Sequence, residues 1–157
     1  MLLSLDLSLN ETGYCVDTSQ SIASGILKPP KNLTQYEKIE YNLTKILELV
    51  EANNIKLVGI EAAAYGMKSS SMNILAEQQG VIKHELRKRG VSVTEVAISS
   101  IKKYITGKGN AKKVQVIQSL RDKYNILATN HNECDAIALH LYLKSQESVI
   151  TIWIIKK

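Results

Sequence analysis

The sequence predicts an α/β domain with a mixed five-stranded sheet, an antiparallel meander followed by parallel strands, and helices on both faces. Three short apolar stretches open the chain at residues 2–9, 12–18 and 21–28, with only turn residues between them, which is typical of a meander. From residue 33 onward, helical and strand-like patterns alternate, which is typical of strands joined by helices. The chain has neither an internal repeat nor a long linker, so we expect residues 1–157 to form one domain.

The later elements each have a local signature. Paired prolines in KPPKN (28–32) end the meander, because proline cannot continue a sheet ladder. Leucine and isoleucine then recur at helical spacing over 33–53. The remaining predicted elements are a strand at 55–63, a helix at 70–90, a strand at 91–99, and helices at 111–124 and 133–143. We expect the apolar tail at 149–155 to be a short strand or an apolar plug packed on the domain, since an exposed apolar strand would favour aggregation.

Positive charge is concentrated in one segment. The whole chain carries +5, whereas residues 102–123 alone carry +6. The basic residues of this segment are Lys102, Lys103, Lys108, Lys112, Lys113, Arg121 and Lys123. Such a run is either a solvated face or a binding surface for a polyanion, and charge alone leaves both readings open.

The cysteines and the apolar segments bear on the compartment. Cys15 and Cys134 have no CxxC spacing and no histidine cluster beside them, so we expect two buried thiols, which suit a reducing cytoplasm. The longest apolar tail is far shorter than the roughly 20 residues that span a bilayer, and we find no targeting pattern. We therefore expect a cytoplasmic protein that does not enter a membrane.

Three acids stand on three separate apolar elements. Asp6 lies in the first strand-like run, Glu61 ends a predicted strand, and Asp135 lies in the first turn of an apolar helix. Burying an uncompensated carboxylate costs several kcal/mol. Each acid alone also fits a structural role, such as a helix-capping residue for Asp135. Together they predict a cation site, and hard oxygen donors favour Mg²⁺ or Mn²⁺ over zinc.

Four motifs stand in order along the chain, from residue 2 to about residue 143: LDLSLNETGYCV, IEAAAYGMKSSSMNILAEQQGV, SIKKYITGKGNAKKVQV and ECDAIAL. Together they resemble the RuvC family of Holliday-junction resolvases, in the RNase H-like superfamily, and especially its compact bacteriophage-encoded members. The third is the most specific, because it resembles the family's Lys, Gly-x-Gly and Ala-x-Lys signature. The resemblance implies an RNase H-like fold and a homodimer that nicks two opposed strands of a four-way junction.

The resemblance also assigns roles to single residues. It implies that Asp6, Glu61 and Asp135 are catalytic acids that hold two Mg²⁺ or Mn²⁺ ions, and that Lys113 acts beside them at the scissile phosphate. The residues that it implies contact DNA are Lys102, Lys103, Lys108, Lys112, Lys113, Tyr65 and Lys68. Branched DNA and a second copy of the chain are then the expected partners, with no small-molecule substrate and a bacterial, possibly phage-encoded, source.

Two positions depart from the family pattern. The family's last helix presents two metal-facing groups three residues apart, which pairs Asp135 with Asn132, a neutral and weaker ligand. Glu133 would supply the missing charge, and we expect it to contribute to the metal site and to catalysis, directly or through a bound water. The aromatic wedge that bacterial members insert into the junction is replaced by Ala64, with Tyr65 beside it.

Two other functions remain open from the sequence. One is a related nuclease that acts on forks or on RNA–DNA hybrids, because the basic block does not fix the substrate. The other is a non-catalytic junction-binding protein, which Asn132 supports and which the retained acids oppose. A binder of a polyanion gains nothing from an acid cluster that repels phosphate.

Overall fold

The computed structural model describes residues 1–62, 70–128 and 130–155, and for residues 70–72 and 147–155 it describes the backbone alone. A five-stranded sheet forms the centre, with strand order β3-β2-β1-β4-β5. The strands are β1 (Leu2–Asp6), β2 (Thr12–Asp17), β3 (Ile22–Leu27), β4 (Leu57–Glu61) and β5 (Ser92–Val96). The first three pair antiparallel, whereas β4 and β5 join as parallel strands. The predicted mixed sheet is confirmed.

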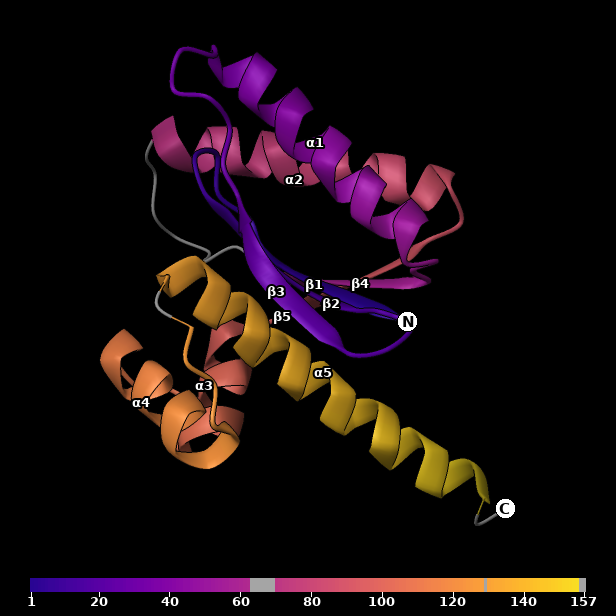
Figure 1. Cartoon of the computed structure of the whole chain (residues 1–157), viewed down its shortest axis with the longest axis vertical. Helices are drawn as coiled ribbons and strands as arrows, with labels where there is room; N and C mark the ends of the chain where they lie inside the picture. The colour runs from indigo at the N-terminus through magenta and orange to yellow at the C-terminus, as the bar shows by residue number, and fades with distance from the viewer. Residues whose placement is uncertain (63–69, 129, 156–157) are drawn as a thin grey trace.

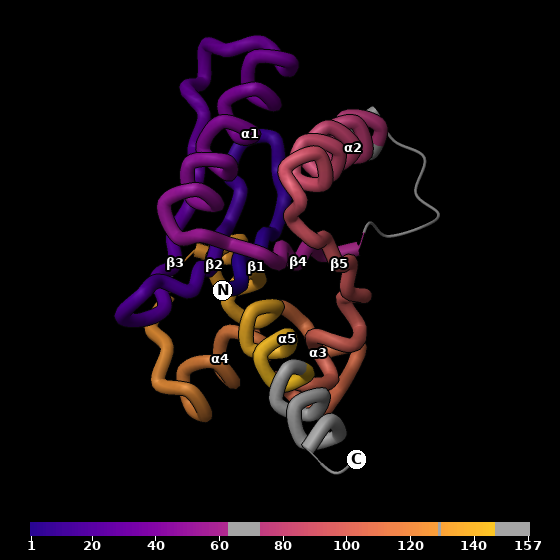
Figure 2. Tube along the Cα trace, turned by 90° about the vertical axis from the view of Figure 1, so that its right-hand side faces the viewer, coloured from indigo at the N-terminus to yellow at the C-terminus, as the bar shows by residue number. Residues whose placement is uncertain are grey.

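Helices cover both faces of this sheet (Figure 1). On one face lie α1 (Gln35–Ala52) and α2 (Ser70–Lys88), and on the other lie α3 (Ile98–Thr106), α4 (Lys113–Tyr124) and α5 (His131–Ile155). The view turned by 90° shows the same two layers, with α1 and α2 side by side (Figure 2). None of the described helices is long and apolar enough to cross a membrane.

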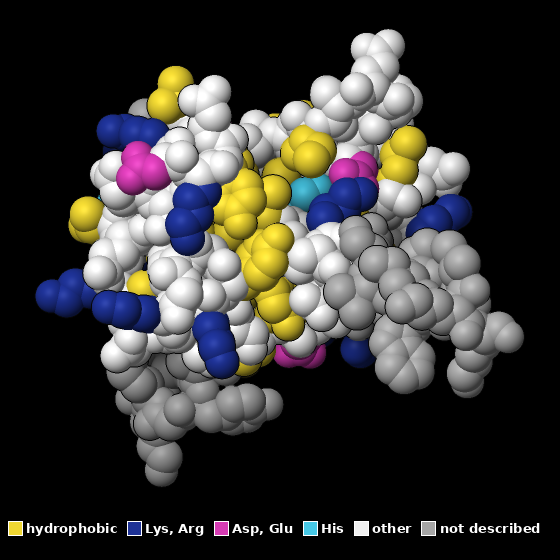
Figure 3. Space-filling view, turned by 90° about the horizontal axis from the view of Figure 1, so that it is seen from below, with side chains coloured by type: hydrophobic (Ala, Val, Ile, Leu, Met, Phe, Trp, Pro, Cys, Tyr) yellow, Lys and Arg dark blue, Asp and Glu magenta, His cyan; other side chains and the backbone are white. Residues whose placement is uncertain are grey.

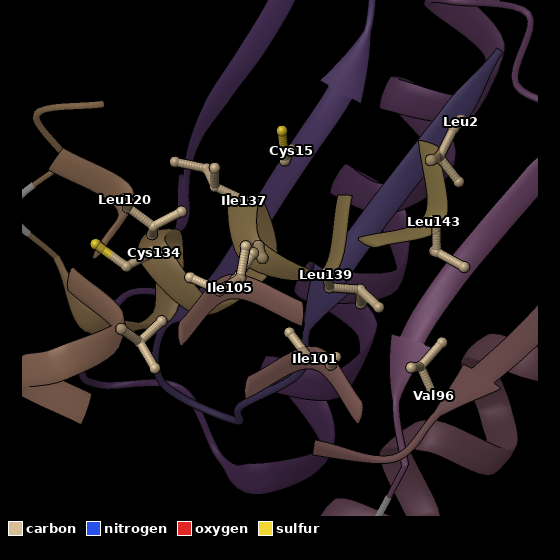
Figure 4. Packing of buried hydrophobic residues seen from close by; sticks show 13 residues of the cluster. Leu2, Cys15, Val96, Ile101, Ile105, Leu120, Cys134, Ile137, Leu139 and Leu143 are labelled. Carbon is tan, nitrogen blue, oxygen red and sulfur yellow. The ribbon is translucent and has the colours of Figure 1, made fainter. Parts of the chain in front are cut away.

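Each face of the sheet has its own hydrophobic core, because successive strand residues point to opposite faces. Leu3 and Leu5 of β1 pack with Ile46 of α1 on one side. On the other side Leu2 and Cys15 pack against the apolar residues of α3, α4 and α5, where Ile105, Leu120, Ile137 and Leu139 meet (Figure 4). The second core fixes α5 against the strands.

Two predicted elements differ from the structure. The strand expected over 91–99 ends at Val96, and α3 follows it directly. The sequence prediction missed α3, whose Ile101 and Ile105 are buried one turn apart and whose end is marked by Gly107 at φ 84°. The tail at 149–155 is not a strand, because α5 continues through it to Ile155.

Candidate active site

Two of the predicted acids lie side by side at one edge of the sheet. Asp6 is the last residue of β1 and Glu61 is the last residue of β4. The strands are parallel neighbours, and the pair Leu5–Ile60 lies one residue before both acids. Because the side chains of paired residues point to the same face, the two carboxylates share the face that α5 covers.

A glycine lets the start of α5 approach this edge. Gly13 pairs with Asp6 across β1 and β2, and a Cβ atom at Gly13 would lie 2.0 Å from the carbonyl oxygen of Asn132. Any side chain at Gly13 would therefore push α5 away. This contact brings Asp135, the fifth residue of α5, to the two strand acids.

The Asp135 carboxylate is held by a lysine. Lys113, the first residue of α4, donates from Nζ to Asp135 Oδ2 at 3.0 Å. Asp6 and Glu61 have no side-chain hydrogen bond or ion pair to any of the residues that the structure describes. The site therefore contains one compensated and two uncompensated carboxylates.

Burial and mutual repulsion change the acidity of the strand acids. Burial first, and then the charges of Glu61 and Asp135, raise the pKa of Asp6 to about 7. Burial and the charge of Asp135 likewise raise the pKa of Glu61 to about 7, although Lys113 and Lys102 oppose the shift. Burial alone would lower the pKa of Lys113, but the hydrogen bond and charge of Asp135 outweigh it and raise that pKa. The charge of Lys113 acts on both strand acids, but among the described residues neither acid forms an ion pair with a lysine.

The predicted DNA-contacting lysines differ in whether they act on this cluster of acids. Lys102, on α3, is close enough to act on the Glu61 carboxylate. Lys103, Lys108 and Lys112 are exposed on α3, in the following loop and at the N-cap of α4. Figure 3 views the molecule from below and shows separate Lys and Arg side chains around a band of hydrophobic ones. Tyr65 and Lys68, like Ala64, lie outside the described residues.

Asn132 and Glu133 point in different directions. Glu133 Oε1 accepts a hydrogen bond of 2.7 Å from Ser24 Oγ on β3, two strands from β1. Its charge acts on the two cysteines and on neither strand acid. Asn132 donates from Nδ2 to the carbonyl oxygen of Glu11, in the loop that follows Asp6. The structure therefore places Asn132, and not Glu133, toward the Asp6 side of α5.

The loop after Asp6 is fixed from several helices. The Asn42 amide of α1 and the Gln78 amide of α2 both donate to the carbonyl oxygen of Ser8, at 3.2 and 3.4 Å. Asn132 holds the other end of the loop at Glu11. The sequence prediction missed these contacts. The polar Asn42 and Gln78 within otherwise apolar helix faces were the available signal, because buried amides require partners.

Comparison with known proteins identifies the family of the chain. Residues 2–142 match the family described as "Crossover junction endodeoxyribonuclease RuvC". The chain belongs to the RuvC family. It is 30% identical to the RuvC protein of Treponema denticola over 125 residues, which are 76% of this chain and 70% of that protein. It is 31% identical to the RuvC protein of Bacteroides fragilis over 126 residues, or 77% and 67% of the two chains.

Solved structures of RuvC proteins share the fold. The Thermus thermophilus RuvC in complex with a Holliday-junction substrate superposes with a TM-score of 0.75 at 16% identity, over 90% of both chains. A fowlpox virus resolvase, also solved with junction DNA, gives 0.56 at 16% identity over 94% of this chain and 99% of that one. The predicted RNase H-like fold and the predicted family are thereby confirmed.

The donor set fits the metal dependence of the RuvC family. The donors are hard carboxylate oxygens, and two of them lack a positive partner. Within the described part of the chain, however, no three Asp, Glu, His or Cys side chains already enclose a metal position. The carboxylates form an open cluster in which the Lys113 ammonium provides the positive charge.

Proposed function

We propose that Asp6, Glu61 and Asp135 hold two Mg²⁺ or Mn²⁺ ions and cut the DNA backbone at a four-way junction. The chain is a metal-dependent endodeoxyribonuclease of the RuvC family, and Holliday-junction resolution is its function. The observation that carries the residue assignment is the pair of uncompensated carboxylates on β1 and β4, beside Asp135. We further propose that residues 1–157 act as one domain in the bacterial cytoplasm.

The residues of this chain would divide the work as follows. When bound, the ions would activate a water molecule and stabilise the leaving oxygen. Asp6 and Glu61 would orient the ions from a rigid sheet edge, and Asp135 would close the site from α5. Lys113 would move from Asp135 toward the scissile phosphate once the ions neutralise the carboxylates. The lysines Lys102, Lys103, Lys108 and Lys112 would neutralise neighbouring phosphates.

For the fourth metal-facing group, the contacts favour Asn132. The sequence favours Glu133 by charge, but the Glu133 carboxylate accepts a hydrogen bond from Ser24. We propose that Asn132 contributes its amide oxygen or orients a bound water, and that Glu133 contributes only after it leaves Ser24. Either residue then adds to a site whose main ligands are the three carboxylates.

We propose that the protein acts as a homodimer through α2. Gly80 lies exposed in the middle of α2, and apart from the helix's own backbone no atom of the described residues lies within 4 Å of a Cβ placed there. An exposed helical glycine costs about 1 kcal/mol relative to alanine, so a folded monomer alone gives no reason for it. A second copy packed closely on α2 would give one. Sedimentation equilibrium of Gly80→Gln should show a shift from dimer to monomer, whereas Arg87→Gln, farther along α2, should not.

One set of measurements tests the nuclease assignment. Four-way junctions, forks, duplex DNA and RNA–DNA hybrid are bound in EDTA in a gel-shift assay, and Mg²⁺ is then added. We expect preferential binding of the junction and paired nicks only after Mg²⁺. Binding without nicks at any Mg²⁺ or Mn²⁺ concentration would identify a junction-binding protein instead, and preferential cutting of the hybrid would identify a ribonuclease H.

A further inference from the structure

A basic pocket lies beside the β1–β2 loop, on elements other than those that carry the lysines of α3 and α4. It has a volume of about 430 Å³ and is lined by Asn10, Glu11, Lys28, Pro29, Lys31 and Lys38. Its three lysines come from the residue after β3, from the β3–α1 connection and from α1. No sequence motif pointed to it, because these lysines are dispersed over eleven residues, from the end of β3 to the first turn of α1.

Specific contacts hold the walls of this pocket in place. Lys28 forms an ion pair with Glu11, which also accepts a hydrogen bond of 3.2 Å from Asn130 Nδ2. Lys38 Nζ donates to Asn10 Oδ1 at 2.9 Å. Hydrogen bonds from Lys28 and then Asn130 lower the pKa of Glu11, so this carboxylate is ionised at neutral pH. The pocket is thus an arranged group of side chains.

Charge in the pocket is positive. The carboxylate of Glu11 compensates Lys28, whereas Lys38 contacts a neutral amide oxygen. For Lys31 there is no ion pair with any acid in the described ranges. Two ammonium groups therefore remain uncompensated around an open hollow, and such a hollow attracts an anion with several acceptor oxygens.

The pocket lies on the same sheet edge as Asp6. Asp6 pairs with Gly13, and Gly13 pairs with Ile26 of β3, which runs parallel to β1. Lys28 follows Ile26 by two residues, so its backbone lies roughly 10 Å across the sheet and roughly 7 Å beyond Asp6 along the strands. The loop from Asp6 to Glu11 connects the two places, and Asn132 donates to its end.

We propose that this pocket binds a backbone phosphate of the DNA, a few nucleotides from the phosphate that is cut. The proposal rests on the proposed nuclease function and extends it to a second contact on the opposite side of Asp6 from α3 and α4. Lys31 and Lys38 would supply the charge, and Lys28 with Glu11 would keep the pocket open. A strand held at both places crosses the carboxylate cluster in a fixed direction.

The affinity test compares single-lysine variants. Lys31→Ala and Lys38→Ala are bound to a four-way junction in EDTA over a range of salt concentrations, with Lys56→Ala as the control. Lys56 is exposed and directly precedes β4, so it lies at the sheet edge opposite Glu61. We expect each pocket variant to bind about three- to tenfold more weakly, with a salt slope shallower by about 0.9 per lost contact. Lys31→Arg should restore both values. Thermal unfolding verifies that each variant is folded.

Neutral linkages locate the phosphate that is bound. Methylphosphonates are placed one at a time within about six nucleotides on either side of the cut, and cleavage by the wild type is compared with cleavage by Lys31→Ala. At one position the neutral linkage should weaken the wild type but not the variant, as a coupled pair requires. Salt slopes equal to that of Lys56→Ala, or additive effects at every position, would overturn the pocket proposal. If the wild type and Lys56→Ala failed to cut the unmodified junction, the nuclease assignment itself would be contradicted.

Discussion

Two acids on the same face of the sheet, Asp6 and Asp17, have opposite environments. Asp6 ends β1 near Asp135 at the start of α5, whereas Asp17 ends β2 at the other edge of the sheet, near His140 and Lys144 farther along α5. The same helix therefore covers both acids. Asp17 contacts three polar groups, whereas the Asp6 carboxylate contacts no donor among the described residues.

The Asp17 carboxylate is fully bonded. It accepts hydrogen bonds of 3.0 Å from the Leu2 amide and from Lys144 Nζ, and His140 Nε2 lies 3.2 Å from its Oδ1. The other ring nitrogen of His140 lies 3.2 Å from Ser4 Oγ. Burial alone would raise the pKa of Asp17, but the hydrogen bonds from Lys144 and Leu2 and the charge of His140 outweigh it and lower that pKa. This network joins α5 to the first two strands.

The difference in bonding distinguishes a carboxylate with a structural role from one with a functional role. A buried carboxylate with a complete set of donors stabilises the fold, and its removal leaves those donors unpaired. A buried carboxylate without donors destabilises the metal-free fold, so its presence indicates a ligand that supplies the missing charge. Asp17 fits the first description, and Asp6 fits the second.

The largest expected effect is the loss of cleavage in Asp6→Asn. The amide keeps the shape of the side chain but removes one charged ligand, so we expect cleavage to fall by on the order of a thousandfold or more. Junction binding in EDTA should be retained or strengthened, because a charge that repels phosphate is gone. Glu61→Gln should behave in the same way. Single-turnover cleavage and gel shift measure both effects, and a well-folded Asp6→Asn that cuts at the wild-type rate would refute the catalytic assignment.

Asp17→Ala should lower the stability of the protein and leave its cleavage rate nearly unchanged. It leaves His140, Lys144 and the Leu2 amide without their shared acceptor, and we expect a loss of about 3 kcal/mol in the free energy of unfolding. Urea denaturation in EDTA measures it. Asp122→Ala, which removes an exposed acid of α4, should change stability by less than about 0.5 kcal/mol. Cleavage per folded molecule should stay within about twofold of the wild-type rate in both variants. A selective loss of Mg²⁺ affinity in Asp17→Ala would show instead that Asp17 acts at the metal site.

Lys113 should affect the reaction more than binding. Lys113→Met removes the ammonium that contacts Asp135, and we expect cleavage to fall by roughly 10- to 100-fold while junction affinity falls by less than about threefold. Lys103→Met is the control, because that exposed lysine contacts no acid among the described residues. Lys123 is unsuitable as a control, since its Nζ donates to the carbonyl oxygen of Ile105 at the end of α3. Equal small effects at Lys113 and Lys103 would favour a diffuse basic face.

Without metal, Asp6 and Asp17 should contribute to the free energy of unfolding in opposite pH ranges. The pKa of Asp6 and that of Glu61 are raised to about 7, so between about pH 4 and 7 the folded protein holds more protons than the unfolded chain. Their contribution to stability is present below about pH 4 and is lost as the pH rises to 7. The pKa of Asp17 is lowered, so its contribution is present above about pH 4 and is lost at lower pH.

Urea denaturation in EDTA from pH 5 to 8 measures this difference. The free energy of unfolding should fall with rising pH in the wild type and fall less in Asp6→Asn. Added Mg²⁺ should reduce the fall in the wild type, because a bound cation stabilises the ionised carboxylates. Parallel curves for wild type and Asp6→Asn would contradict the assigned environment of Asp6.

The sequence predicted one of these two sites and could not predict the other. Asp6 and Glu61 interrupt apolar strands, so an unpaired acid is visible from its neighbours alone. Asp17 and His140 are 123 residues apart, and neither has a local signal that indicates the other. The same reasoning explains the missed α3, because its first residues continue the β-branched pattern of β5 and only Ile101, Ile105 and Gly107 indicate a helix. Both the Asp17–His140 pair and the start of α3 depend on tertiary contacts, which the sequence does not display.

The smallest expected effect concerns the fourth metal-facing group. Glu133 is bonded to Ser24, and Asn132 contacts the loop that follows Asp6. We expect Asn132→Ala to raise the Mg²⁺ concentration for half-maximal cleavage by about three- to tenfold, and Glu133→Ala to raise it by less than twofold. Both substitutions remove a side chain from the first turn of α5, so each is the control for the other.

Ser24→Ala tests whether Glu133 can reach the metal site, because it frees the Glu133 carboxylate and changes neither candidate ligand. A freed carboxylate could turn toward the cluster and add charge to a site with three carboxylates, since the first turn of a helix frays readily. If Asn132 is the fourth group, Ser24→Ala should leave the Mg²⁺ requirement unchanged. A lower requirement in Ser24→Ala that disappears in Ser24→Ala/Glu133→Ala would show instead that charge decides the site and that Glu133 reaches it. Titration of Mg²⁺ against the single-turnover cleavage rate separates these outcomes.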